Sequence, residues 1–152
     1  MPYVENTLRL KLNEVVFLMS AEKIRTDDLS NLLFDFCKEY VGPSYNNYKN
    51  FIGELRQCAA EIERRQLTSK KFFIYKISPE MAKKAIERVI KFMAESEIKA
   101  DGDLNYILFK FCKYHTGGRR KFVKMLKNCA LRIEAELLAP YEDFKIVANG
   151  DV

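Results

Sequence analysis

Apolar residues recur every three or four positions along most of the chain, which is the spacing of one face of an α-helix. The first such stretch contains Leu8, Leu12, Val15, Val16 and Met19. A second stretch contains Ala82, Ile86, Val89, Ile90 and Met93. A third contains Phe122, Leu126, Cys129, Ile133 and Leu137. The pattern predicts a mainly all-α protein.

The pattern also repeats. Residues 28–38 (DLSNLLFDFCK) and residues 103–113 (DLNYILFKFCK) are identical at 7 of 11 positions. Upstream, Val15 and Phe17 match Ile90 and Phe92. Downstream, with four residues fewer in the loop of copy two, the matching pairs are Phe51 and Phe122, Leu55 and Leu126, Cys58 and Cys129, Ala59 and Ala130, Ile62 and Ile133. We infer a tandem duplication of a unit of about 75 residues.

Start and stop signals divide each copy into three helices. Ser78, Pro79 and Glu80 begin the first helix of copy two with a capping serine, a first-turn proline and an acid near the positive end of the helix dipole. Short polar residues start the second helices near 26–27 and 101–103, and glycines end them near 41–43 and 116–118. The third helices are predicted over residues 48–67 and 119–138.

The segments after the third helices have a different character. Residues 70–77 (KKFFIYKI) are aromatic and β-branched, which favours a short strand. Their counterpart, within EDFKIVANG, predicts an extended segment near residues 143–148, and one arrangement pairs the two across a twofold axis. Pro140 is expected to end the helix before it.

These boundaries define repeat one as residues 1–77 and repeat two as residues 78–152. A three-helix unit of this size has a limited core and, in our interpretation, leaves one apolar face uncovered. The two repeats would cover that face on each other and form one compact domain, a helical bundle with pseudo-twofold symmetry. Because fusion removes the concentration dependence of dimerising, we expect a monomeric pseudo-dimer, with a higher homo-oligomer as the alternative.

The composition is typical of a soluble protein with a core of its own. Of 152 residues, 48% are hydrophobic and 31% are charged. Arg9, Lys11 and Glu14 interrupt the apolar positions near the N-terminus, so that segment does not predict a signal peptide. No run approaches the roughly 18 apolar residues of a membrane span. We expect a cytoplasmic protein with no membrane partner.

The four cysteines are Cys37, Cys58, Cys112 and Cys129, and none forms a C-x-x-C pair. We interpret them as buried thiols, since free cysteine packs as a small core residue. A zinc site built from all four is the alternative, although zinc ligands usually come in pairs two to four residues apart. We therefore predict no metal and no cofactor.

The net charge is +5, and one stretch of copy two is strongly basic. Between Leu104 and Ile133 there are eight Lys or Arg residues and no Asp or Glu. Of these, Arg119, Arg120, Lys124 and Lys127 lie on or beside one face of the third helix. Free N–H groups at the start of that helix could add to a phosphate site. The alternatives are a solvated helix face and a nucleic-acid surface, the latter weakened by the lack of exposed aromatics at base-stacking spacing.

The sequence contains no recognisable catalytic motif. A P-loop, a G-x-G-x-x-G after a strand, a G-x-S-x-G and a metal-type histidine cluster are all absent. A nucleophile pair of Cys112 with the single histidine, His115, is disfavoured because Cys112 lies on the apolar side of its helix. We therefore expect a protein that is not an enzyme, with no catalytic residues.

Several phrases resemble a small family of uncharacterised phage and prophage proteins that consist of one such unit. Members of that family begin with Met-Pro-Tyr, contain Gly-x-Leu-Asn-Tyr, end a helix in Glu-Phe-Tyr-Arg-Arg and finish in Pro-Tyr-Glu-Asp and Asn-Gly-Asp-Val. Here the phrases are divided between the copies. Copy one keeps Pro2, Tyr3, Arg64 and Arg65. Copy two keeps Gly102, Leu104, Asn105, Tyr106, Pro140, Tyr141, Glu142, Asp143, Lys145, Asn149, Gly150 and Asp151.

The two copies together therefore supply one full set of the family's polar groups, and two interpretations fit. In the first, Arg64 and Arg65 clamp the C-terminal tail through Glu142 and Asp143, as an arginine–carboxylate fork allows. In the second, one ligand pocket between the copies is lined by Arg64, Arg65, Asn105, Tyr106, Tyr141, Glu142, Asp143, Asn149 and Asp151.

The function indicated is that of a non-enzymatic, phage-related binding protein in the host cytoplasm. It would hold an anionic ligand, either a nucleotide-type molecule or a nucleic acid, on the basic face or between the repeats. An acidic protein would suit the same face, and by analogy such binding could counter host defence. The alternative is a structural or adaptor protein that contacts a host or viral protein through its helix faces.

Overall fold

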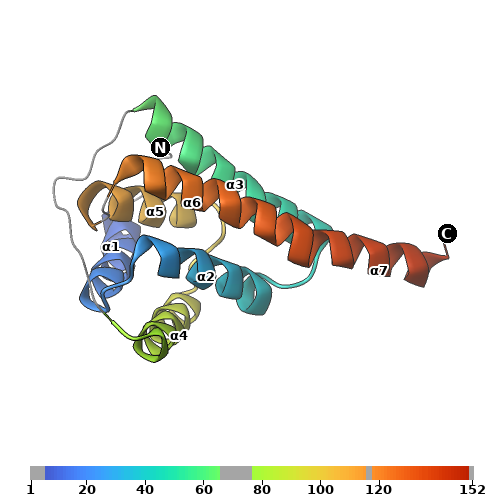
Figure 1. Ribbon diagram of the computed structural model, residues 1–152, viewed down its shortest axis with the longest axis horizontal. Helices are drawn as coiled ribbons and strands as arrows, with labels where there is room; N and C mark the ends of the chain where they lie inside the picture. Colours follow the sequence, from blue (N-terminus) through green and yellow to red (C-terminus); the bar gives the residue numbers. More distant parts are fainter. Residues whose placement is uncertain (1–5, 66–76, 116–117, 151–152) are drawn as a thin grey trace.

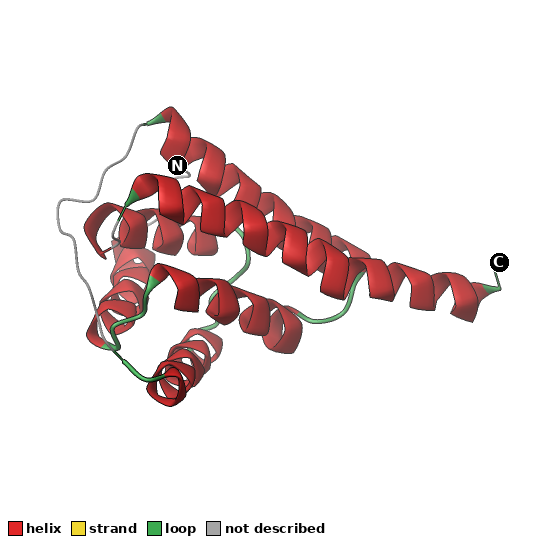
Figure 2. Cartoon of the chain, in the orientation of Figure 1, coloured by secondary structure: helices red, strands yellow, loops and turns green. Residues whose placement is uncertain are grey.

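The computed structural model describes residues 6–65, 77–115 and 118–150, and these form helices joined by loops, with no strand among them (Figures 1 and 2). The all-α prediction is confirmed. The helices of copy one are α1 (Asn6–Ala21), α2 (Thr26–Phe36) with the π-turn η1 (Cys37–Val41), and α3 (Tyr45–Arg64). Those of copy two are α4 (Pro79–Glu95), α5 (Gly102–His115), α6 (Arg119–Ile133) with the π-turn η2 (Glu134–Leu138), and α7 (Ala139–Asn149).

Short polar side chains cap the helix starts, as the sequence predicts. Ser78 Oγ accepts the backbone N–H of Met81 at 3.2 Å and so begins α4, while Pro79 occupies the first turn. At α5, Asp101 Oδ1 accepts the N–H of Asp103 at 3.2 Å. These bonds satisfy N–H groups that have no partner within the helix.

The start of α2 uses a different device. The carboxylate of Asp28, which is buried, reaches back to the backbone N–H of Arg25 at 3.2 Å and to the Arg25 guanidinium at 2.8 Å. The matching Asp103 in copy two accepts the N–H of Lys99 at 3.2 Å. Each aspartate therefore fastens the preceding loop to its second helix.

The prediction that Pro140 ends the third helix of copy two is wrong. The chain continues from α6 through the π-turn η2 into α7, with Pro140 in the first turn of α7. A proline lacks an N–H and its ring clashes with the carbonyl four residues earlier in a regular helix. The wider π-turn before Pro140 accommodates this misfit without ending the helix.

The extended segment predicted near residues 143–148 is also wrong, because these residues lie within α7. Helical pairing satisfies their backbone groups locally, whereas a strand needs a neighbouring partner strand. Gly150 ends α7 in the left-handed region at φ 72°. The strand predicted over residues 70–77 falls almost wholly on residues 66–76, outside the described residues.

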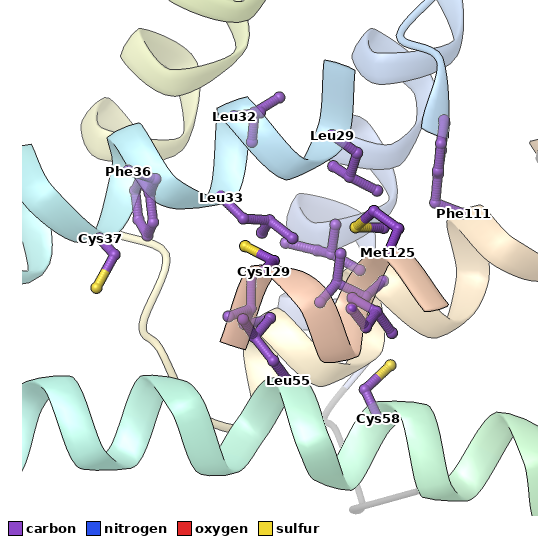
Figure 3. Packing of buried hydrophobic residues seen from close by; sticks show 14 of the residues in the cluster. Leu29, Leu32, Leu33, Phe36, Cys37, Leu55, Cys58, Phe111, Met125 and Cys129 are labelled. Atoms are coloured by element: carbon purple, nitrogen blue, oxygen red, sulfur yellow. The ribbon is translucent and has the colours of Figure 1, made fainter. Parts of the chain in front are cut away.

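The core lies between the helices of the two copies. The helix α3 packs along α6, α1 packs on α5 and α4, α2 packs on α4 and α6, and α5 packs on α3. Figure 3 shows Leu29 and Leu33 of α2 facing Met125 and Cys129 of α6, with Leu55 of α3 on the other side. This differs from the expected pair of three-helix units that meet at one leftover face, because the main contacts run between copies.

None of the described helices combines the length and apolar character that crossing a membrane requires. The helix α7 projects past the rest of the bundle (Figure 1). It buries none of its residues, and Phe144 and Val147 are 65% and 71% exposed.

Candidate anion-binding site

The basic residues singled out in the sequence gather around one hollow at the N-terminal half of α6. The hollow has a volume of about 650 Å³ and lies where α6 passes the C-terminal end of α3. Its lining residues are Glu63, Arg119, Arg120, Val123, Lys124, Lys127 and Asn128. A hollow of this size is within the range of small-molecule sites.

The amphipathic pattern of α6 explains how the cations come together. Phe122 and Leu126 are fully buried against the other helices. Helical periodicity therefore turns Arg120, Lys124 and Lys127 outward along one side, where all three are exposed. The same packing that forms the core thus presents a row of positive charge.

The hollow carries an excess of positive charge. Glu63 is the one carboxylate in its lining among the described residues, and it pairs with Lys127 at 2.7 Å between Oε1 and Nζ. Four cations and one anion leave a formal charge of +3 (4 − 1). Within the described part of the chain, no ion pair engages Arg120 or Lys124. Both side chains are therefore available to an anionic ligand.

The start of α6 strengthens the positive field. Gly118 occupies the N-cap position and provides no side chain to accept the first N–H groups of the helix. Arg119 and Arg120 follow directly, so the positive end of the helix dipole and two guanidinium groups lie at the edge of the hollow. These groups are suited to phosphate or carboxylate oxygens.

The structure does not bring together the divided polar set that the resemblance suggested. Arg64 and Arg65 both turn to Glu61 on their own helix, each at 2.7 Å. The pKa of Glu61 is lowered to about 2, and the hydrogen bond from Arg64 is the largest cause. Arg65 also lies over the ring of Phe109, 5.4 Å from its centroid.

The C-terminal segment meets α3 at the other end. Tyr141 contacts Tyr48 edge to face, with ring centroids 5.9 Å apart. Tyr48 precedes Arg64 by 16 residues, or about 24 Å along a helix. The structure therefore does not bring Arg64 and Arg65 to Glu142 and Asp143, because α7 continues away from the bundle instead of folding back (Figure 1).

The residues expected to line a pocket between the copies are likewise spread over separate parts of the fold. Asn149 is exposed at the far end of α7, and Asp151 lies outside the described residues. Asn105 and Tyr106 are instead buried in α5. The Tyr106 hydroxyl donates to Asn13 Oδ1 of α1 at 3.0 Å, so it joins the two copies.

The four cysteines are buried free thiols, as predicted. Burial raises the pKa of Cys37 and Cys112 to about 12 and that of Cys129 to about 11, and it also raises the pKa of Cys58. Such thiols resist forming the thiolate that nucleophilic attack requires. The side chain of His115 is not among those described, and the described residues contain no cluster suited to a metal ion.

Sequence reasoning missed a second hollow of about 590 Å³ between α2 and α4. Its lining includes the carboxylates of Asp35, Glu39 and Glu87. The acidic residues on these helices were visible in the sequence, but their spacing did not reveal that α2 would lie beside α4. The role of Glu63 in the basic hollow was missed for the same reason, since it depends on how α3 meets α6.

The fold and the hollow define a class: an all-α protein built from a duplicated three-helix unit, with a basic surface on one copy. The chain matches the family described as Domain of unknown function (DUF6899) twice, over residues 1–70 and 77–152, and it belongs to that family. The two matches agree with the tandem duplication. No curated protein and no solved structure matches the chain.

Proposed function

We propose that this protein is a non-enzymatic binding protein that holds an anionic ligand in the basic hollow of α6. The observation that carries the proposal is the gathering of Arg119, Arg120, Lys124 and Lys127 around one hollow whose lining holds a single carboxylate among the described residues. Because the cations share a concave surface, one multiply charged ligand can contact several of them at once.

The shape of the site favours a small ligand of nucleotide type over a nucleic acid. A hollow of about 650 Å³ suits a molecule of that size. A single-stranded nucleic acid is usually held by an extended basic groove with aromatic side chains for base stacking. The lining of this hollow contains no aromatic residue among the described positions.

The biological setting belongs to the same proposal. The resemblance to phage and prophage proteins supports a phage-encoded protein that acts in the host cytoplasm. A protein that holds a host nucleotide without turning it over would lower the free concentration of that molecule. By analogy, sequestration of this kind would counter a host defence that signals through nucleotides.

The test compares two double charge reversals of equal size. Arg120→Glu with Lys124→Glu reverses the two unpaired cations of the hollow. Lys49→Glu with Lys91→Glu is the matched control, because both lysines are exposed and lie on α3 and α4, away from the hollow. Each variant changes the net charge by −4, so any difference between them reports on the site and not on total charge.

The measurement is retention on a heparin resin and on a phosphate resin as salt is increased. Ion release makes such binding strongly salt-dependent, with a slope that grows with the number of contacts. We expect the Arg120/Lys124 variant to lose retention and the Lys49/Lys91 variant to keep most of it, with both remaining helical by circular dichroism. Equal losses in both variants would show a general charge effect and refute the proposed site.

The ligand class needs a separate experiment. Native mass spectrometry of the protein purified from its natural host, at low salt, should detect a retained small anion. The Arg120/Lys124 variant, purified in parallel, should lack it. Retention of RNA or of a protein in place of a small molecule would refute the nucleotide-type ligand.

A second candidate function rests on α7. Its projection past the bundle, with Phe144 and Val147 exposed, suits an adaptor that docks a protein partner on this helix. Phe144→Asp with Val147→Asp should then abolish capture of a defined host or viral protein, and the Arg120/Lys124 variant should still capture it. A partner lost with the charge reversal alone would favour the basic hollow instead.

A further inference from the structure

The contacts between helices keep the same form when the two copies are exchanged. Matching helices are α1 with α4, α2 with α5, and α3 with α6. The contact of α1 with α5 then corresponds to that of α4 with α2, and the contact of α2 with α6 corresponds to that of α5 with α3. The remaining main contacts are those of α1 with α4 and of α3 with α6, and each is unchanged when the two copies are exchanged.

Two ion pairs follow the same exchange. Phe51 matches Phe122, an offset of 71 residues (122 − 51), so Arg56 matches Lys127 and Glu63 matches Glu134. Arg56 pairs with Glu134 at 2.8 Å, and Lys127 pairs with Glu63 at 2.7 Å. Each pair is thus the counterpart of the other, and together they show that α3 and α6 run antiparallel.

Small residues lie between these two ion pairs on both helices. Ala59 and Ala130, which match each other, are both fully buried there. Small residues at a crossing allow two helix backbones to come near. A twofold axis that exchanges α3 and α6 would pass through this point.

Other side chains also reach from one copy to the other. Arg132 of α6 stacks over Phe34 of α2 at 3.9 Å and donates to Asn31 Oδ1 at 3.0 Å. Further contacts between the copies are Tyr106 with Asn13, Arg88 with Glu22, Arg65 with Phe109, and Cys129 Sγ with the carbonyl of Ser30. Within copy one, Phe36 contacts Phe51.

From these observations we infer that the two copies are intertwined about a twofold axis and that neither forms a core of its own. The surface each copy buries is an interaction surface whose partner is a second copy of the same unit. A copy without its partner loses the main packing contacts of all three of its helices. This mutual dependence of the two copies does not require a ligand in the basic hollow.

The physical consequence concerns the connection between the copies. Because the helices interlock, the chain that joins them is not what holds them together; it raises their effective concentration. Cutting the connection should convert a one-chain protein into a two-chain complex with the same helices. Stability should then depend on protein concentration, as it does for an obligate dimer.

The first test cuts the full-length protein in place. A site-specific protease sequence is inserted within residues 66–76, and the folded protein is cleaved and examined by size exclusion and circular dichroism. We expect the two fragments to elute together with the helical signal retained. The thermal midpoint of the cut protein should fall on each tenfold dilution, while that of the uncut protein stays constant.

The inference is overturned if either fragment, at monomer mass, keeps a cooperative helical unfolding transition. Fragments that separate and lose their helical signal support it, because neither then folds alone. Fragments that stay together as a helical complex also support the inference.

A second test needs no cut. Native-state hydrogen exchange of the intact protein should show the slowest amides of α3 and of α6 opening with the same free energy and the same dependence on denaturant. Independent cores would let one copy open while the other stays protected. Protection that persists in one copy at a denaturant concentration that opens the other would overturn the inference.

Discussion

The two ends of the antiparallel pair of α3 and α6 are formed by matching positions of the two copies, but the side chains at these positions differ. At the start of α3, Tyr48 is buried under the edge of Tyr141 from α7. At the start of α6, the matching position is Arg119, and it lines the basic hollow. One end is closed by an aromatic contact and the other is a concave, positively charged surface.

This difference separates what packing requires from what it leaves free. Residues that face the crossing have stayed apolar in both copies, because each of them is buried against the other copy. Positions that face solvent carry no such requirement, and the cations have accumulated at one end of the pair. A ligand site on this protein is therefore expected once per chain, in spite of the duplication.

The largest effect is expected for matched core positions. Leu55→Ala and Leu126→Ala each remove a fully buried side chain at equivalent places in α3 and α6. Each should lower the free energy of unfolding by about 2–5 kcal/mol, and by similar amounts because the two leucines serve one shared core. Urea unfolding followed by circular dichroism measures this.

Leu131→Ala is the control, because Leu131 is 57% exposed and the matching residue of copy one, Ala60, is already alanine. It should change stability by about 0.5 kcal/mol or less. A large loss for one core leucine with almost none for the other would contradict the shared core.

An intermediate effect is expected where an arginine of one copy lies on an aromatic ring of the other. Arg132 lies 3.9 Å from the Phe34 centroid and also bonds Asn31, whereas Arg65 lies 5.4 Å from the centroid of Phe109. Arg132→Ala should cost about 1–2 kcal/mol and Arg65→Ala about half of that. The closer stacking and the additional hydrogen bond account for the difference.

Arg132→Lys sharpens this comparison, since it keeps the charge but loses the planar guanidinium. Its cost should be close to that of Arg132→Ala if stacking dominates. Thermal or urea unfolding distinguishes the cases, and an equal, negligible cost at both arginines would show that neither contact contributes.

Most of the helices could be predicted from the sequence, because the period of apolar residues and the caps at Ser78 and Asp101 are local signals. The end at Pro140 could not, because a π-turn relieves the clash that normally ends a helix there. The pairing of copies was not accessible either. The same apolar faces are compatible with two self-contained units or with an intertwined pair, and the periodicity is identical in both.

The candidate site also contains residues that the sequence could predict and residues that it could not. The cations Arg120, Lys124 and Lys127 were predictable from their spacing on one helix face. Glu63, which borders the same hollow, comes from α3 and depends on the crossing of two distant segments. The structure places Arg64 and Arg65 apart from the described part of the tail, and a shared family phrase carries no information on which helix ends lie together.

The smallest effect is expected in acid, and it concerns copy one alone. Glu61 has its pKa lowered to about 2, and the hydrogen bond from Arg64 is the largest cause, whereas the matching residue of copy two is Arg132, which has no carboxylate. A carboxylate with a lowered pKa stabilises the fold above its unfolded pKa of about 4.3, and this contribution is lost as pH falls toward 2.

The stability difference between wild type and Glu61→Gln should therefore be constant from pH 7 to about 5 and shrink below that. Arg64→Ala with Arg65→Ala, which removes two of the groups that lower this pKa, should weaken the same acid dependence. Urea midpoints measured from pH 7 to 2.5 test this, and a difference that stays constant down to pH 2.5 would show that the Glu61 carboxylate contributes nothing to holding the end of α3.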